Sequence, residues 1–211
     1  LLFTGEAFWI GAVNEQYTPT LYKLAHSGFV FENFYNPLWY YSTVDGEYAA
    51  TTGLIPTNQV NASQRYAGKN GVSMYFSMGN QLRALGYPTL AYHNNTANYY
   101  DRNLSHPNLG YDFYACDTGL DVAMTWPQSD LEMMQLTLPQ ALAGEKPFHN
   151  YYMTVSGHMN YSFAGNAMSA KHRDEVADLD MSEAARAYLA CNMELDQALE
   201  YTIKTLEEAG E

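Results

Sequence analysis

The sequence is poor in basic residues and in cysteine. Lys and Arg together number 10 against 23 Asp and Glu, which gives a formal net charge of −13. A nucleic-acid partner is therefore not expected, because binding a phosphate backbone needs clustered cations. Two cysteines are too few for a scaffold held by disulfides. Cys191 lies in an apolar helical stretch and is expected to be a buried thiol, although pairing with Cys116 stays open.

Long apolar runs are also missing. No stretch approaches the ~20 residues of a membrane span, and no signal peptide is visible before Leu1. The first residues are typical of the end of a buried strand, and the last ones of a helix that ends at Gly210. We therefore expect residues 1–211 to be a partial domain, with any membrane anchor in segments of the parent protein outside this chain.

Short apolar runs alternate with helical stretches, which predicts an α/β fold with a mostly parallel sheet flanked by helices. Strands are expected at residues 1–4, 28–35, 89–93 and 148–155. Helices are expected at residues 18–26, 43–52, 77–85, 129–143 and 182–209. Functional groups of such sheets gather at the carboxyl ends of the strands, so Glu6, His93 and His158 are expected to converge there.

Two oxygen-bearing residues are candidates for metal and phosphoryl chemistry. A carboxylate just past a buried strand is costly unless it is paired or bound to a cation, which makes Glu6 a candidate metal ligand. The alternative is that Glu6 is the first exposed residue of a loop. Thr43 begins a helix, where a hydroxyl can be a cap or a metal-activated nucleophile aided by the positive helix end. The local pattern alone favours the cap.

A second group of residues is suited to binding an anion. Arg102 offers a planar fork for phosphate or sulfate oxygens, His93 can add a hydrogen bond, and Tyr100 can pack on a glycerol or sugar face. His158 follows a strand and can hold an oxyanion or protonate a leaving oxygen. An ordinary surface loop and a structural histidine are the alternatives. The remaining histidines have no comparable context and are expected to be structural or surface residues: His26, His106, His149 and His172.

In this order, these stretches resemble the lipoteichoic acid synthase branch of the sulfatase/alkaline phosphatase superfamily. Glu6-Ala7-Phe8 is similar to its Glu-Ser-Phe element, and residues 42–48 are similar to its Lys-Thr-Ser-Asp-x-Glu-Phe segment. Four residues keep that spacing: Thr43, Asp45, Glu47 and Tyr48. Ser42 and Val44 depart from the family's Lys and Ser.

The resemblance continues through the rest of the chain. His93-Asn94-Asn95 is similar to the family's His-Gly-Asn, and Tyr100 and Arg102 stand where the family has Trp and Arg. Residues 110–114 resemble its Gly-Tyr-Asp-x-Phe strand, and residues 154–161 resemble its Thr-x-Ser-x-His-x-x-Tyr segment. The family's Asp-His metal pair would lie beyond Glu211.

The resemblance implies a metal-dependent phosphoglycerol transferase with a phosphothreonine intermediate on Thr43. Glu6 and Thr43 would be metal ligands, and four residues would bind the substrate: His93, Tyr100, Arg102 and His158. Oxygen donors favour Mn²⁺ as the one divalent ion, with Mg²⁺ or Zn²⁺ as alternatives. The implied donor is phosphatidylglycerol or a similar glycerophospholipid headgroup, and the implied acceptor a glycerol phosphate. The implied location is the extracellular face of a bacterial membrane.

Two other functions stay open. A sulfatase or phosphodiesterase hydrolase can use the same fold, although Thr43 is not followed by the Pro and Arg of the sulfatase Cys/Ser-x-Pro-x-Arg segment. A binding domain without catalysis is the alternative from another class, for which the departures at Ser42 and Val44 leave room. Fold alone does not decide between them.

Overall fold

The computed structural model describes residues 1–35, 42–56, 74–144 and 147–211, which divide into two compact units. Unit 1 comprises Leu1–Thr4, Asn33–Leu120 and Gly144–Met153, and unit 2 comprises Gly5–Glu32, Asp121–Ala143 and Thr154–Glu211. Within these ranges, no helix has both the length and the apolar character needed to cross a bilayer.

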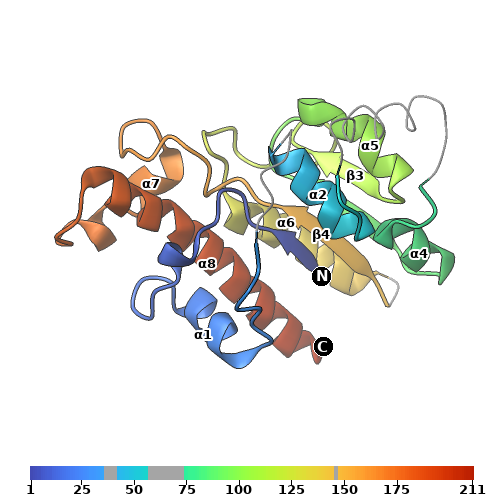
Figure 1. Ribbon diagram of the computed structural model, residues 1–211, viewed down its shortest axis with the longest axis horizontal. Helices are drawn as coiled ribbons and strands as arrows, with labels where there is room; N and C mark the ends of the chain where they lie inside the picture. Colours follow the sequence, from blue (N-terminus) through green and yellow to red (C-terminus); the bar gives the residue numbers. More distant parts are fainter. Residues whose placement is uncertain (36–41, 57–73, 145–146) are drawn as a thin grey trace. The chain divides into compact units, whose positions relative to one another are not determined.

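The described part of unit 1 is built on a parallel sheet of four strands. Their order is β1 (Leu2–Thr4), β4 (His149–Met153), β2 (Thr89–His93) and β3 (Asp112–Ala115). Parallel neighbours need crossover connections, which helices provide in α/β folds. The sheet confirms the predicted fold class and the strands expected at 1–4, 89–93 and 148–155, with shifts at their ends (Figure 1).

The described part of unit 1 contains four helical segments: α2 (Ser42–Thr52), α4 (Met78–Ala84), the 3₁₀ turn η2 (Tyr99–Asp101) and α5 (Arg102–Asn108). Helix α5 packs on β3, and α4 packs on β2. The helices expected at 43–52 and 77–85 are confirmed, and each is followed by a glycine with positive φ, Gly53 at 69° and Gly86 at 88°. The sequence patterns did not predict α5, which begins at Arg102.

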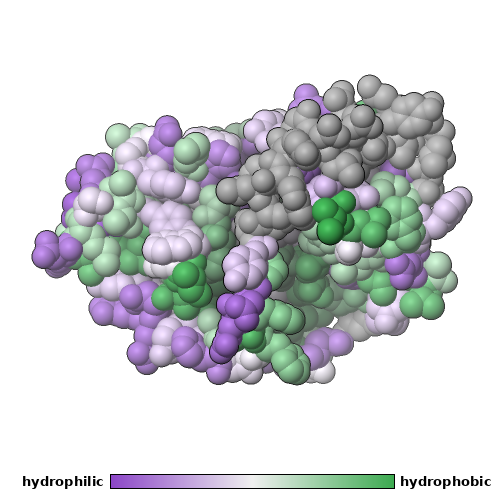
Figure 2. All heavy atoms as spheres, in the orientation of Figure 1, coloured by the Kyte–Doolittle hydropathy of each residue, from purple (hydrophilic) through white to green (hydrophobic). Residues whose placement is uncertain are grey.

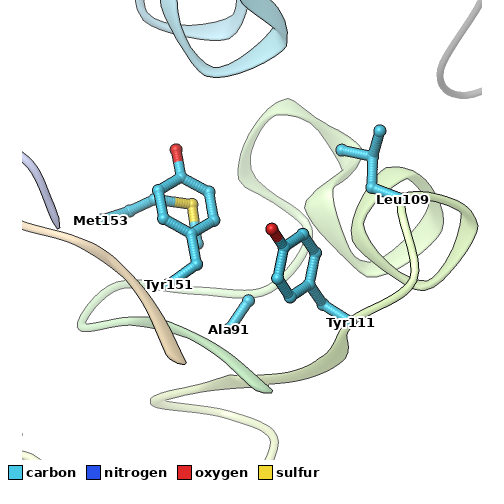
Figure 3. Close-up of a cluster of buried hydrophobic side chains, with 5 residues drawn as sticks. All are labelled: Ala91, Leu109, Tyr111, Tyr151 and Met153. Atoms are coloured by element: carbon cyan, nitrogen blue, oxygen red, sulfur yellow. The ribbon is translucent and has the colours of Figure 1, made fainter. Parts of the chain in front are cut away.

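Two buried tyrosines dominate the core of unit 1. Figure 3 shows the rings of Tyr111 and Tyr151 with Ala91 between them and Leu109 and Met153 at the sides. Both tyrosine hydroxyls have partners, because Tyr151 lies 2.9 Å from the Thr4 hydroxyl and Tyr111 lies 3.2 Å from His149 Nε2. A buried phenol is stable only with such partners, so the apolar rings and their polar tips are both accommodated.

Unit 2 is helical, and its elements pack on the long helix α8 (Glu183–Ala209). The elements in contact with α8 are η1 (Ile10–Ala12), α1 (Pro19–Ser27), α6 (Asp130–Ala143), α7 (Ala167–Lys171) and η3 (Asp174–Val176). Figure 1 shows α1 and α7 beside α8. The three longer helices confirm the predictions for 18–26, 129–143 and 182–209.

The ends and the interior of α8 follow its sequence. Ser182 caps the helix by accepting a hydrogen bond from the Ala185 N–H at 3.3 Å, and Gly210 ends it with a φ of 76°. The buried side of the helix includes Leu189 and Ala190, which pack with Val176. Cys191 is a buried thiol, as predicted, and it donates to the Tyr188 carbonyl at 3.2 Å.

The predicted strand at residues 28–35 is wrong. All of these residues are described, and they form bends and turns without a strand. The alternation of apolar and polar residues is present, but Phe29 is 100% exposed and Phe31 is 76% exposed. An alternating pattern produces a strand only where a neighbouring strand supplies hydrogen bonds and a buried face. Hydrophobic as well as hydrophilic side chains are visible on the face drawn in Figure 2.

Candidate active site

The carboxyl ends of all four described strands lie in one row of the sheet. Met153 at the end of β4 is in register with Thr4 of β1 on one side and with His93 of β2 on the other, and His93 is in register with Ala115 of β3. Segments that leave strands at a common edge are where α/β folds place their functional groups. Several candidate site residues therefore lie at these strand ends or in the segments that follow them.

Helix α2 places Thr43 and Glu47 on one helical face. Thr43 lies in the first turn of α2 and is half-buried, and Glu47 follows four residues later and is 2% exposed. Residues four apart lie above one another on a helix, so the hydroxyl and the carboxylate point to the same side. The first turn of a helix also presents backbone N–H groups to an anion. Thr43 thus stands where a nucleophile for a phosphoryl group is favourable.

Glu47 binds Arg102 in a buried ion pair. The guanidinium Nε lies 3.1 Å from Glu47 Oε1 and 3.2 Å from Oε2, and Nη2 lies 2.5 Å from Oε1. The side chains are 2% and 3% exposed for Arg102 and Glu47. A two-pronged contact of this kind matches the fork of arginine to the carboxylate and neutralises both buried charges. Arg102, predicted as a substrate-binding residue, therefore has Glu47 as its partner in this structure.

The same guanidinium reaches His93. Arg102 Nη1 lies 3.2 Å from His93 Nε2, and His93 Nδ1 lies 3.0 Å from the Met153 carbonyl oxygen. A carbonyl only accepts, so Nδ1 carries the proton and Nε2 accepts from Arg102. Burial and the Arg102 charge lower the pKa of His93 to about 3, against the opposing effects of the Met153 carbonyl and Glu47. His93 is therefore neutral at physiological pH and has a defined tautomer.

Tyrosine rings lie against the guanidinium. The centre of the Arg102 guanidinium is 5.3 Å from the Tyr100 ring centroid and 5.9 Å from that of Tyr99. Tyr100 and Asp101 adopt positive φ values of 57° and 52°, which few residues other than glycine tolerate. Backbone strain of this kind is maintained only where the surroundings hold it, and it is common at functional sites. Tyr100 is partly exposed.

In unit 2, the segments that follow β1 and β4 contact each other. The Glu6 N–H donates to the Thr154 hydroxyl at 2.9 Å. Gly157 lies so close that a Cβ there would be 2.7 Å from the Glu6 carbonyl oxygen. The Tyr188 hydroxyl donates to the Ala7 carbonyl at 3.1 Å and accepts from the Trp9 N–H at 2.7 Å. The backbone around Glu6 is therefore fixed from two sides.

His158 is held at the end of the second of these segments. Its Nδ1 lies 3.1 Å from the Met159 carbonyl, and its ring makes an edge contact with Trp126 at 4.9 Å between centroids. The carbonyl accepts, so a neutral His158 ring has its proton on Nδ1 and a lone pair on Nε2. The ring is partly exposed, in keeping with a role in binding or proton transfer.

Each unit thus brings part of the predicted set together. Unit 1 joins His93, Tyr100 and Arg102 to the helix of Thr43, and unit 2 joins the segments of Glu6 and His158. Within the described residues, no group of three or more His, Cys, Asp or Glu side chains could hold a metal ion. Of the other histidines, His106, His149 and His172 are buried and His26 is exposed, as expected for structural or surface residues.

The sequence patterns assigned no role to two buried carboxylates, Glu47 and Asp130. Asp130 accepts hydrogen bonds from the Val155 and Ser156 N–H groups, in the segment that leads to His158. Glu47 kept its place in a family motif, but nothing in the chain indicated that Arg102, 55 residues away, is its partner. A signal was present for both residues, because each stands in a stretch that becomes a buried helix face. An acidic residue in that position needs a partner, so it marks either an ion pair or a site.

Comparisons with known proteins agree with this architecture. Lipoteichoic acid synthase 1 of Bacillus subtilis (strain 168) is 24% identical over 207 residues, which cover 93% of this chain and 30% of that protein. Lipoteichoic acid synthase 2 of the same organism is 24% identical over 157 residues, 70% of this chain and 23% of that protein. The chain therefore spans less than a third of the length of these curated relatives.

Solved structures show the same fold. The crystal structure of the lipoteichoic acid synthase LtaP from Listeria monocytogenes superposes with a TM-score of 0.72 at 21% identity, covering 92% of this chain and 47% of that one. A protein in the alkaline phosphatase superfamily from Vibrio parahaemolyticus superposes with a TM-score of 0.54 at 18% identity, covering 76% of this chain and 38% of that one. The chain therefore shares the fold of these two structures. The Sulfatase family model matches residues 5–211, and the chain belongs to this family.

Proposed function

We propose that this chain is part of a phosphoglycerol transferase of the lipoteichoic acid synthase type, with Thr43 as the nucleophile. The observation that carries the proposal is the position of Thr43 in the first turn of α2, one turn before Glu47 and its partner Arg102. The similarity to two lipoteichoic acid synthases supports the reaction class. The donor would be phosphatidylglycerol or a similar glycerophospholipid headgroup at the extracellular face of a bacterial membrane, and the acceptor a glycerol phosphate.

Glu6 and Thr43 are each proposed as a ligand of a divalent metal ion. Their donors are a carboxylate and a hydroxyl oxygen, which fit Mn²⁺ or Mg²⁺ better than a soft ion, although Zn²⁺ also accepts a carboxylate. Side-chain donors of this kind do not complete a coordination shell by themselves, so water, substrate oxygens or further protein groups would supply the remaining ligands. When bound, such an ion would acidify a coordinated hydroxyl and polarise a phosphoryl oxygen.

The chain's own residues would then carry the transfer in two steps. The Thr43 hydroxyl gives up its proton and its oxygen attacks phosphorus, the bond from phosphorus to the lipid oxygen breaks, and diacylglycerol leaves after its oxygen takes up a proton, so that a phosphothreonine carrying the glycerol forms. An acceptor hydroxyl then loses its proton and attacks that phosphorus, and the Thr43 oxygen leaves and regains a proton. We assign binding of the glycerol-phosphate group to Tyr100, Arg102, His93 and His158. His93 would act as a neutral hydrogen-bonding group, whereas His158 has a lone pair on Nε2 that can take a proton.

The test is substitution of Thr43 in the full-length parent protein. Turnover of a fluorescent phosphatidylglycerol is measured for the wild type, Thr43→Ala and Thr52→Ala. Thr52 is a matched control because it lies on the same helix and donates to the Tyr48 carbonyl. We expect Thr43→Ala to lower turnover by about a thousandfold or more, as loss of a nucleophile does, and Thr52→Ala to change it little. Equal turnover in both variants would falsify the assignment of Thr43.

A hydrolase on the same fold is the second candidate, and membership of the Sulfatase family favours it. The two functions differ only in the acceptor, which is water in the hydrolase. The same assay separates them when the products are resolved by mass spectrometry. A transferase yields glycerol phosphate attached to an acceptor, whereas a hydrolase yields free glycerol phosphate.

A further inference from the structure

Glu47 has a buried carboxylate to which the proposed reaction gives no role. It lies on α2, and its partner Arg102 begins α5, so the ion pair joins two helices of unit 1. A buried ion pair is a poor source of stability, because desolvation of both charges offsets most of their attraction. Stability alone therefore does not explain a carboxylate at this position.

The geometry of the pair has a consequence for His93. A guanidinium is planar, so holding its Nε and Nη2 edge on Glu47 fixes the direction of Nη1. Nη1 then lies 3.2 Å from His93 Nε2 and 3.3 Å from the Tyr99 carbonyl. His93 is thereby held between Arg102 and the Met153 carbonyl. The orientation of the His93 ring therefore depends on the Glu47 carboxylate, which forms no hydrogen bond with the ring.

The pair also constrains Thr43. Glu47 is one turn after Thr43 on α2, so anchoring its carboxylate fixes the rotation of this helix about its axis. His93 is the last residue of β2, at the row of strand ends described above. One ion pair therefore connects the helix of the proposed nucleophile to a proposed substrate-binding histidine at the edge of the sheet.

We propose that Glu47 is a positioning residue: it aims Arg102 at His93, and it ties the helix of Thr43 to the carboxyl end of β2. The effect of Glu47 on catalysis rests on the proposed function, whereas its effect on the His93 ring does not. The proposal predicts that a substitution of Glu47 alters the hydrogen bonds of the His93 ring, although Glu47 forms no direct hydrogen bond with that ring.

The first test reads the His93 ring by ¹⁵N NMR at neutral pH, with a His93→Gln variant to assign its signals. Glu47→Gln is compared with Asp112→Asn, which also removes one negative charge from an ion pair in unit 1 but at the surface, where Asp112 binds Arg83. We expect the wild type and Asp112→Asn to show one tautomer protonated on Nδ1. Glu47→Gln should shift the His93 signals toward a mixture of tautomers. An unchanged His93 spectrum in Glu47→Gln overturns the proposal.

A second variant covers the case in which Glu47→Gln does not fold. Arg102→Lys keeps a cation beside Glu47, but an ammonium cannot span Glu47 and His93 with a rigid fork. The same shift of the His93 signals is expected there. A folded Arg102→Lys protein with the wild-type His93 spectrum contradicts the proposal in the same way.

The activity arm uses the full-length protein and fluorescent phosphatidylglycerol. Loss of a supporting partner in an active site costs about 10- to 100-fold, so Glu47→Gln should lower kcat by that factor with a smaller change in KM. Glu47→Asp should recover part of the loss, and Asp112→Asn should retain wild-type turnover. If Glu47→Gln turns over normally, the positioning role is wrong. If the wild type has no turnover, the proposed function fails, and the His93 spectrum still decides the role of Glu47.

Discussion

The carboxylate of Asp130 holds the backbone of Ser156. It accepts hydrogen bonds from the Ser156 N–H at 3.1 Å, from the Ser156 hydroxyl, and from the Val155 N–H at 2.8 Å. Asp130 is the first residue of α6, and Ser156 lies two residues before His158. One buried side chain therefore fixes the segment that presents a proposed substrate-binding histidine.

Asp130→Ala should lower the free energy of unfolding by about 3 kcal/mol. The substitution leaves two buried N–H groups and a hydroxyl without their acceptor, and each such group costs about 1–3 kcal/mol. Urea unfolding measures the loss. Gln135→Ala is the control, because Gln135 lies on the same helix but is exposed. Equal unfolding midpoints for the two variants would show that the segment is held by other contacts.

Gly157 should not accept a side chain. A Cβ there would lie 2.7 Å from the Glu6 carbonyl oxygen, a backbone atom that cannot move without displacing its segment. We expect Gly157→Ala to destabilise the protein by about 1–3 kcal/mol, as overpacking does.

The control for this prediction is Gly46→Ala, for which a Cβ would meet no atom within 4 Å. Gly46 lies inside α2, where alanine is favoured over glycine by about 0.5–1 kcal/mol, so this variant should be more stable than the wild type. Urea unfolding of both variants checks the pair. A Gly157→Ala protein as stable as Gly46→Ala would contradict the close contact with Glu6.

Local patterns predicted most of the elements and missed those that depend on distant partners. The strand at 89–93 was predicted with its bounds, because a short apolar run between Gly86 and polar residues is typical of a buried strand. Residues 28–35 had an equally clear alternation, but none of the described strands pairs with them. Helix α5 was missed because Pro107 and the polar residues of this segment obscure a helical pattern.

The sequence offered candidate site residues one by one but not their contacts. The order of the motifs made Thr43, His93 and Arg102 candidates, since each motif is a local signal. The ion pair of Glu47 with Arg102 joins residues 55 apart, and it exists only because the fold brings α2 and α5 together. Burial is likewise a tertiary property, so the neutral state of His93 could not be inferred from its sequence neighbours.

His93 and His106 should remain neutral throughout the physiological range. Burial, followed by the charge of Arg102, lowers the pKa of both rings to about 3 from an ordinary value of 6.5. Below pH 6.5 the unfolded chain binds protons on these rings that the folded chain does not, so their contribution to stability falls as the pH drops from 6.5 toward 3. NMR titration from pH 8 to about 5 should leave both ring signals unchanged.

The control is the same titration in urea, where both rings of the unfolded chain should take up a proton near their ordinary pKa. Protonation of either folded ring near pH 6 would mean that Arg102 and burial do not act on it as the structure indicates.

Glu194 should make the folded state sensitive to acid. This buried residue of α8 is bound by Lys171 Nζ at 2.6 Å, by His172 Nε2 at 2.8 Å and by the Ser129 hydroxyl. Burial raises the pKa of the carboxyl, but the hydrogen bonds from His172, Lys171 and Ser129 outweigh it and lower the pKa to about 2. The stability gained from the ionised form is therefore present above the ordinary pKa of 4.5 and is lost as the pH falls toward 2.

Urea unfolding of the wild type and Glu194→Gln between pH 7 and about 3 tests this contribution. The variant should be less stable by roughly 3 kcal/mol at pH 7, because it leaves Lys171 and His172 without their carboxylate. Its disadvantage should shrink as the pH falls below 4.5, since the wild-type carboxylate is then protonated in the unfolded chain. A constant difference between the two proteins over this range would mean that Glu194 stabilises unit 2 through its shape and not through its charge.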